Sequence, residues 1–501
     1  MKIKGTFHKI IFLLFVCLIF MLICAGFTSP LYPHYTGLDS SVFLTVAKGI
    51  VNGRIPYVDL FDHKGPVFYW MEAAGYFIGG RTGVFLFQCL LLTCDLFIVD
   101  RLSSLFRVNF LSLAIPFFAV FFYLFQHGNL TEEFSLPMLY AGVYYELNFL
   151  LSEEEKHAPG IAFFYGILLG LMAFIRLNNA FILCALLLCI IIVLVWKGQW
   201  VNLLGNLCAG LLGLASVAMP ICFYYYRHSA LYDMLYGTFL FNLVYAKNNT
   251  HTPIFSSTFL HFLVLFAPGA YACVIYFLKW KETKHRAYSS LLFTAILTFI
   301  MLAYTNVYMH YYLLGLPLFV VAVAAAGADR PFSAAGNREV ALFPRKQHTM
   351  EPRLKITAAA LACITIIYAC LSAYSACAPI YKTYLTDIAY DEYEQIKAGI
   401  SVIPEEERDS VIGYNVLANF YYHADILPCY RYFTLQKWQT TDKVNVYQDF
   451  MVYLIDEHPL WVIIRAGEED QLIRGILKTG YTRKSADNRY EYYRFIENAR
   501  K

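Results

Sequence analysis

The chain has 501 residues, of which 59% are hydrophobic, 18% are aromatic and only 15% are charged. Soluble globular proteins contain about 25% charged residues, so a soluble fold could not bury this much apolar surface. The same composition excludes a disordered chain. A formal net charge of +3 gives no support to nucleic-acid binding. Composition therefore predicts a mainly α-helical, polytopic membrane protein whose function lies in its polar interruptions.

The apolar segments predict about eleven transmembrane helices, because a spanning helix needs about 20 mostly apolar residues. We expect them near residues 10–29, 82–100, 109–126, 134–151, 160–176, 180–196, 201–223, 254–278, 287–305, 311–328 and 356–376. The first segment has the basic start of a signal peptide, but its core is long and no A-x-A site follows. No internal repeat is visible, so an inverted-repeat transporter has no support from the sequence.

The basic residues outside these segments predict the orientation. In an eleven-span topology they all fall on one side: Lys2, Lys4, Lys9, Arg101, Arg107, Lys279, Lys281, Lys284, Arg286 and the basic residues of the loop 330–355. The positive-inside rule makes that side cytoplasmic. The long loop 30–81, the shorter outer loops and the tail from 377 then face the outside of the plasma membrane.

The chain divides into a transmembrane domain, residues 1–376, and a small extracytoplasmic α/β domain, residues 377–501. In the tail we predict a helix over 390–403, buried strands at Ser410–Tyr414 and Trp461–Arg465, a helix over about 445–457 and a hairpin over 483–495. The thirteen cysteines do not indicate a disulfide scaffold. Cys377 and Cys429 either form one bridge or remain thiols.

The first outer loop begins with a predicted interfacial helix. Asp39 and the two serines after it are good helix starters, and apolar residues recur at helical spacing over the positions that follow: Val42, Phe43, Val46 and Ile50. This pattern predicts a helix that lies in the membrane interface and presents the Asp39 carboxylate at its N-terminus. Alternatively, Asp39 only caps the helix.

The loop continues as an extended segment that carries several charged side chains. Asp59, Asp62, His63 and Lys64 lie within six residues of one another and precede the helix-breaking pair Gly65-Pro66. An ammonium group is a compact donor for phosphate, so Lys64 suits an anionic lipid head group. Alternatively, Lys64 is a lipid anchor whose charged end reaches the interface.

Three more polar segments are expected on the outer face. Glu132 and Glu133 form a doubly acidic loop, although carboxylates there could simply stabilise the N-terminus of the next span. Arg176 lies between two apolar stretches, and ionisable groups at membrane depth are rare and usually functional. His310 and Tyr311 open the tenth span, where a tyrosine could also belong to the interfacial aromatic belt.

These motifs carry a family resemblance. The runs Leu38-Asp39-Ser40-Ser41, Asn52-Gly53-Arg54-Ile55-Pro56-Tyr57-Val58-Asp59 and Asp62-His63-Lys64-Gly65-Pro66 resemble the first outer loop of GT-C glycosyltransferases. That superfamily includes the protein O-mannosyltransferases and the lipid A aminoarabinose transferases. Thr131-Glu132-Glu133 looks like its second acidic site, and His310-Tyr311-Tyr312 looks like its outer-face aromatic motif.

The resemblance implies transfer of a sugar, with inversion, from a polyprenyl-phosphate-linked donor to a cell-envelope acceptor at the outer membrane face. It implies these roles: Asp39 as general base; Glu132 or Glu133 as a group that orients the acceptor or assists the base; Lys64, Arg176 and His310 as donor-phosphate ligands; Asp62, His63 and Tyr311 as substrate or metal contacts. The sugar and the acceptor are not identified.

Two departures from the family pattern affect the cofactor. Ser40 stands where family members often have a second acid, and His63 stands where the aminoarabinose transferases have a metal-binding glutamate. No cofactor is therefore assigned, and a divalent metal ion is left open.

Two other functions are also left open. One is a lipid or polysaccharide transporter, which would favour charged residues within the spans. The other is a non-enzymatic partner that binds glycan or protein, in which Asp39 and Lys64 would be dispensable.

Overall fold

The structure is a computed structural model that describes residues 2–152, 154–248, 259–304, 308–328, 388–440 and 444–496, with Cys370 and Tyr374. The contacts within the chain divide it into two compact units. The first unit comprises Met1–Cys24, Phe87–Ile221 and His251–Pro379. The second comprises Ala25–Leu86, Cys222–Thr250 and Ile380–Lys501.

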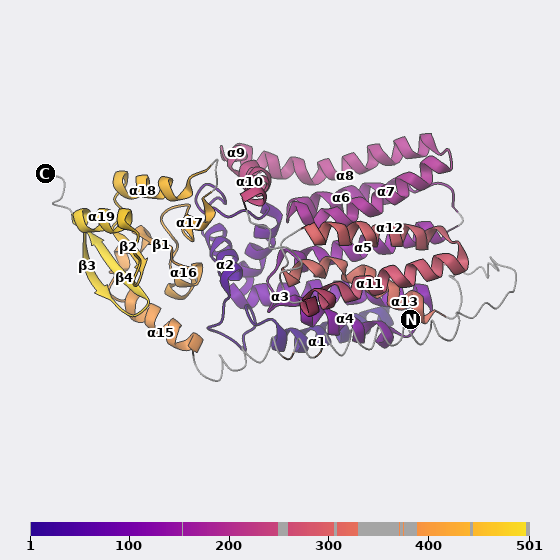
Figure 1. Cartoon of the computed structure of the whole chain (residues 1–501), viewed down its shortest axis with the longest axis horizontal. Coiled ribbons are helices and arrows are strands. Elements are labelled where there is room, and N and C mark those ends of the chain that lie inside the picture. Colours follow the sequence, from indigo (N-terminus) through magenta and orange to yellow (C-terminus); the bar gives the residue numbers. More distant parts are fainter. Residues whose placement is uncertain are drawn as a thin grey trace. The chain divides into compact units, whose positions relative to one another are not determined.

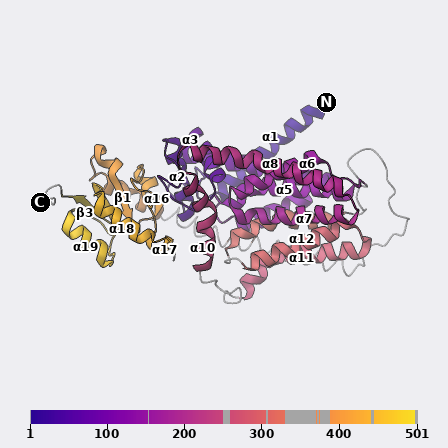
Figure 2. The same cartoon turned by 90° about the horizontal axis from the view of Figure 1, so that it is seen from above.

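The first unit is a helical bundle. Its helices are α1 (Lys2–Cys24), the second half of α3 (Pro66–Phe106), α4 (Phe110–Phe125), α5 (Thr131–Leu151), α6 (Pro159–Ala173), η1 (Leu177–Ala180), α7 (Phe181–Trp196), most of α8 (Trp200–Arg227), α11 (Phe259–Thr283), α12 (Arg286–Tyr304), η3 (Met309–Gly315) and α13 (Leu316–Gly327). Helix α11 packs on α12 and α13, α12 on α7, and α5 on α6 and α7 (Figure 1; Figure 2). Apolar side chains form the core of the bundle.

Several of these helices have the length and composition of membrane spans. Among the described residues, five are long and apolar enough to cross a bilayer: Phe7–Cys24, Pro66–Phe106, Leu177–Trp196, Trp200–Arg227 and Met309–Gly327. Three shorter helices are also apolar. The prediction of a mainly helical chain with several apolar helices is confirmed. The number eleven stays a prediction, because the segment 356–376 and part of 254–278 lie outside the described residues.

The second unit begins with the segment that contains the loop 30–81. It contains α2 (Leu38–Val51), the first half of α3, and the short elements α9 (Leu231–Leu235), η2 (Tyr236–Leu240) and α10 (Phe241–Asn248). The helix predicted after residue 38 is therefore confirmed. Its N-cap is Gly37, whose φ of 63° lies in the left-handed region that favours glycine.

The C-terminal part of the second unit is a small α/β domain (Figure 1). Its elements are α15 (Ile388–Ile400), η4 (Glu405–Ser410), β1 (Val411–Tyr414), α16 (Ala418–Ala424), α17 (Gln436–Gln439), α18 (Val446–Asp456), β2 (Trp461–Arg465), α19 (Gln471–Gly480), β3 (Tyr481–Ala486) and β4 (Tyr490–Phe495). The strand order is β1-β2-β4-β3, with β1 parallel to β2 and the other pairs antiparallel. The predicted helices, buried strands and hairpin of this tail are confirmed.

A shared core joins the loop 30–81 to this domain within the second unit. Phe61 of the loop, Phe241 of α10 and two residues of the C-terminal domain, Tyr432 and Val446, form one buried apolar cluster. Helix α16 also packs against α2. The Sγ atom of Cys429 lies 3.3 Å from the hydroxyl of Tyr453. Cys377 lies outside the described residues, so the predicted bridge is untested.

Helix α3 depends on a close backbone approach between two glycines. Its direction changes at Gly79 and Gly80, which have non-helical backbone angles, and the two halves meet at Gly75 and Gly83. A Cβ atom on Gly83 would lie 2.0 Å from the carbonyl oxygen of Gly75, so only glycine fits there.

We expect Gly83→Ala to lower the free energy of unfolding by roughly 1–3 kcal/mol through overpacking against backbone atoms. The matched control is Gly205→Ala in α8, where a Cβ atom would meet nothing within 4 Å. Alanine favours helix there, so the control should keep or raise the melting temperature of the purified protein. Equal melting temperatures for the two variants would contradict the close approach.

Candidate active site

The Asp39 carboxylate lies in the first turn of α2. The N-cap residue of this helix is Gly37, and no side chain provides a capping hydrogen bond. Asp39 is exposed, and none of the described residues donates a hydrogen bond to its carboxylate. The structure therefore does not support the alternative in which Asp39 is the cap, although a carboxylate is still favourable near a helix N-terminus.

One face of α2 carries both Asp39 and a contact to Lys64. Phe43 follows Asp39 by four residues, so both side chains lie on the same face of the helix. The ammonium nitrogen of Lys64 lies 5.5 Å from the centre of the Phe43 ring, which is a cation–π contact. Helix α2 thus presents an exposed carboxylate one turn before the ring that contacts the buried lysine.

The side chains of three consecutive residues, Asp62, His63 and Lys64, contact one another in sequence order, and Lys64 is the last of them. Its ammonium donates to Nε2 of His63 over 3.0 Å, so that nitrogen is an acceptor and Nδ1 carries the imidazole proton. Nδ1 in turn lies 3.1 Å from Oδ1 of Asp62. Only 7% of Lys64 is exposed. The carboxylate of Asp62 therefore balances a buried ammonium with an imidazole between them.

Two buried tyrosines fix the backbone of this chain of polar groups. The Tyr69 hydroxyl donates to Oδ2 of Asp62 and accepts from the backbone nitrogen of Lys64. The Tyr57 hydroxyl donates to the carbonyl oxygen of Lys64 over 2.7 Å. Asn242 of α10 donates to the carbonyl oxygen of His63 over 2.8 Å. The position of Lys64 is thus determined by both its backbone and its side chain.

The pKa of Asp62 reflects the positive charge of its neighbours. Burial alone would raise the pKa of Asp62, but Lys64, His63 and the hydrogen bonds from His63 and Tyr69 hold that pKa well below its ordinary value. Asp62 is therefore ionised at neutral pH.

The Asp62–His63 arrangement does not fit a metal ion. The lone pair of His63 Nε2 is already used by the Lys64 ammonium, and an adjacent ammonium opposes a cation. Among the residues that the structure describes, no group of three His, Cys, Asp or Glu side chains could hold a metal.

The first unit contains the second polar cluster. Nη1 of Arg176 donates to Oε1 of Glu132 over 2.8 Å, and Nη2 donates to the Tyr311 hydroxyl over 2.6 Å. The guanidinium also lies 4.6 Å from the centre of the Tyr311 ring. Thr131 donates to the other oxygen of Glu132. The structure thus brings together three of the predicted site residues from segments far apart in the sequence.

Glu133 has a different environment from Glu132. Its carboxylate accepts from Nε2 of Gln88 over 2.8 Å and from the backbone nitrogen of Asn129 over 3.0 Å. Because it binds the turn before its own helix, Glu133 fits the structural role better than the catalytic one. Nδ1 of His310 lies 2.9 Å from Oε1 of Gln126.

The sequence did not point to several residues that shape these clusters. Tyr57, Tyr69 and Asn242 support the Lys64 backbone, and Gln88 and Gln126 bind the predicted acid and imidazole. The chain contains 40 tyrosines, so nothing in the sequence singles out Tyr57 and Tyr69. A glutamine inside an apolar helix, such as Gln88, does indicate a polar partner nearby, because buried polar groups need hydrogen-bond partners.

Comparisons with known proteins match this architecture. A family model described as the putative competence-induced protein Ccs4 N-terminal domain matches residues 2–376. No curated protein matches the chain.

Solved structures with a similar fold include ArnT from Cupriavidus metallidurans. Bound to undecaprenyl phosphate, it is 11% identical, with a TM-score of 0.57 over 98% of this chain and 99% of that chain. Its apo state gives 11% identity and a TM-score of 0.54 over 100% and 99%. The oligosaccharyltransferase AglB from Archaeoglobus fulgidus, solved in complex with an inhibitory peptide and a dolichol-phosphate, is 13% identical. Its TM-score is 0.49, and the match covers 97% of this chain and 74% of that chain. The predicted GT-C-like fold is confirmed by the likeness to ArnT.

The ion pair between Arg176 and Glu132 yields a test of its role. Glu132 is 1% exposed, so Arg176→Gln leaves a buried carboxylate unpaired and should cost roughly 3–5 kcal/mol. The double variant with Glu132→Gln should recover part of this loss, because the two side chains act on each other. The measurement is the melting temperature in a double-mutant cycle.

The exposed pair of Lys197 and Glu155, 3.6 Å apart, provides the control cycle. Its coupling should be below about 1 kcal/mol, because solvent screens it. Strictly additive losses at Arg176 and Glu132 would show that the pair does not stabilise the bundle.

Proposed function

The chain belongs to the Ccs4 family, and from this premise and its fold we propose that it is an integral-membrane glycosyltransferase. The donor is a sugar linked to a polyprenyl phosphate, and the acceptor is a hydroxyl group of the cell envelope. ArnT, whose structure was solved with undecaprenyl phosphate, has a similar fold over almost its whole length. That likeness supports the lipid-linked donor.

One observation carries the proposal: α2 carries an exposed carboxylate that accepts no hydrogen bond from the described residues and, one turn later, a phenyl ring that contacts a buried ammonium of the following loop. Asp39 is exposed in the first turn of α2, and Lys64 contacts Phe43 one turn later. A free carboxylate suits proton removal, and a positioned ammonium suits an anionic leaving group. If Asp39 were only a helix cap, its carboxylate would not need to be exposed. If Lys64 were only a lipid anchor, its ammonium would not need to be buried.

The reaction is a direct displacement at the anomeric carbon. Asp39 accepts the proton of the acceptor hydroxyl as its oxygen forms a bond to the sugar. The bond from the anomeric carbon to the phosphate oxygen breaks, and the polyprenyl phosphate leaves with that electron pair. The configuration at the sugar therefore inverts.

Lys64 stabilises the charge that grows on the departing phosphate. His63 uses one of the three ammonium protons, and two remain for a ligand. Asp62 and His63 act as positioning residues, because they orient the ammonium. Arg176 and His310 of the first unit stay predictions from the sequence as phosphate ligands, and Arg176 is already paired with Glu132. No step requires a metal ion.

We place this chemistry on the outer side of the plasma membrane. The basic residues of the predicted loops gather on one side, which the positive-inside rule makes cytoplasmic. The loop with Asp39 and Lys64 and the C-terminal domain then face outward.

Substitution of the base is the first test. Asp39→Asn keeps the size of the side chain and removes its basicity, and no capping bond is lost. We expect turnover to fall by roughly 10² or more while the melting temperature stays unchanged. The measurement is undecaprenyl phosphate released from a panel of undecaprenyl-phosphate sugars, followed by mass spectrometry. Normal turnover by this variant would exclude Asp39 as the base.

Substitution of Lys64 tests the phosphate site separately from catalysis. Undecaprenyl phosphate should raise the melting temperature of the wild-type protein, because a ligand stabilises the state that binds it. Lys64→Met should abolish this rise. Lys48→Met is the matched control, since Lys48 of α2 pairs with Asp425 over 2.7 Å instead.

Lys64→Met also leaves Asp62 buried without its ammonium, so the comparison uses the change caused by lipid rather than the apo melting temperature. The variant Asp62→Asn/Lys64→Met removes both charges and avoids this penalty. A lipid-induced rise that survives in the double variant would contradict the phosphate role of Lys64.

A further inference from the structure

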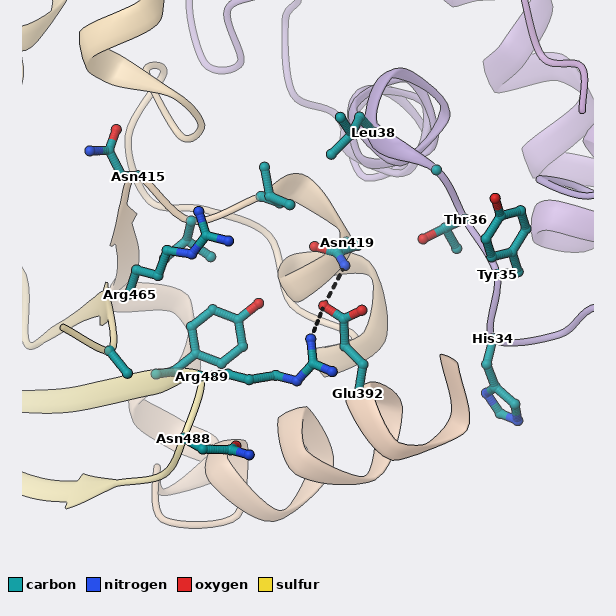
Figure 3. Close-up of a pocket in the computed structure, with 15 residues that line it drawn as sticks. His34, Tyr35, Thr36, Leu38, Glu392, Asn415, Asn419, Arg465, Asn488 and Arg489 are labelled. Carbon is teal, nitrogen blue, oxygen red and sulfur yellow. Dashed lines mark hydrogen bonds and ion pairs between the residues drawn. The ribbon is translucent and has the colours of Figure 1, made fainter. Parts of the chain in front are cut away.

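The second unit contains a cavity of about 450 Å³ that the proposed chemistry does not use. One wall is the segment that leads into α2, from His34 to Leu38. The opposite wall belongs to the C-terminal domain and includes Asn415, Arg465 and Asn488. Figure 3 shows these side chains around the cavity. The volume lies within the range of about 300–1,000 Å³ that is typical of small-molecule sites.

The sheet places this cavity where ligands usually bind in α/β domains. Asn415 directly follows β1, and Arg465 ends β2, which runs parallel to it. The first residue of β4, Tyr490, pairs with Arg465, so the β3–β4 turn lies at the same edge. Ligands of open α/β sheets bind outside the carboxyl ends of the strands.

The cavity has an excess of positive charge. Its ionisable side chains include Glu392, which accepts from Asn419 over 2.9 Å and pairs with Arg489 over 3.5 Å. That carboxylate is therefore balanced within the wall. Arg465 is exposed, and among the described residues no side chain pairs with its guanidinium. One uncompensated positive charge thus faces the cavity.

The other polar groups suit a ligand with hydroxyl groups. Asn488 and Thr36 offer an amide and a hydroxyl, and Tyr35 and Tyr490 add phenol groups with flat apolar faces. Burial and the nearby Arg81 lower the pKa of His34, so its imidazole is neutral at pH 7 and can donate and accept. This lining differs from the mostly apolar lining of typical drug-sized pockets.

We propose that this cavity binds the acceptor, and that the acceptor is a polyhydroxylated molecule whose carboxylate or phosphate group is bound by Arg465. A guanidinium can bind either anion through two parallel hydrogen bonds. Gly37 and Leu38 line the cavity and Asp39 is the next residue, so the bound acceptor lies beside the helix turn that carries the base. The inference rests on the proposed transferase activity.

Equilibrium binding to the purified full chain tests the inference without turnover. The probes are a hyaluronan tetrasaccharide, which carries carboxylates, mannose 6-phosphate, which carries a phosphate, and the neutral chitotetraose. At least one anionic probe should bind more tightly than the neutral one, and which of the two binds identifies the anion. Arg465→Gln should weaken that binding by roughly tenfold or more, because it removes a charge-assisted pair.

The control variant is Arg483→Gln, because Arg483 lies on β3 of the same domain and does not line the cavity. It should bind the anionic probe as the wild type does. Three results would each overturn the inference: no binding of either anionic probe by the wild type, equal binding of chitotetraose, or unchanged binding by Arg465→Gln. Since the assay needs no donor, these results are independent of the turnover measured for Asp39→Asn.

Discussion

The buried ammonium of Lys64 is the group of the second unit on which the surrounding loop and helix α2 depend. A buried charge is costly unless a partner of opposite charge and hydrogen bonds compensate it. For Lys64 the compensation comes from the preceding residues, Asp62 and His63, and two tyrosines bind the backbone of Lys64 itself. The loop therefore takes the conformation that brings Asp62 and His63 close to the Lys64 ammonium. The ammonium also contacts Phe43 of α2. This contact helps to set the rotation of α2 about its axis and therefore the direction of the Asp39 carboxylate.

Another buried cation, Arg81, orders an irregular segment of the same unit by a different set of contacts. The guanidinium of Arg81 donates to the carbonyl oxygens of Gly26, Phe27, Tyr32 and Tyr35, so it holds the segment that precedes α2 without a carboxylate. This segment continues directly into one wall of the cavity. A charged side chain that binds several backbone oxygens satisfies polar groups that a loop otherwise leaves unpaired. The cavity wall therefore depends on a residue that does not line it.

Local patterns in the sequence predicted elements well, whereas partners across the fold could not be predicted. The helix after residue 38, the strands of the tail and the hairpin at Asp487 follow from periodicity and turn residues over a few positions. The pairing of Arg176 with Glu132 joins residues 44 positions apart, and no local rule specifies it. Gly37 takes the N-cap position because its φ is positive, which the capping preference of aspartate did not anticipate.

Helix α2 connects the two proposed binding events through its own geometry. Gly37 and Leu38 line the cavity at its N-terminal end, and Phe43 contacts the Lys64 ammonium one turn after Asp39. An acceptor in the cavity restrains the first turn of the helix, and a phosphate at Lys64 restrains the ring one turn later. A helix turn transmits position rigidly, because its backbone hydrogen bonds link each residue to the fourth one before it. Both substrates therefore limit the freedom of Asp39, and a base held in this way loses less entropy when the hydroxyl proton is removed.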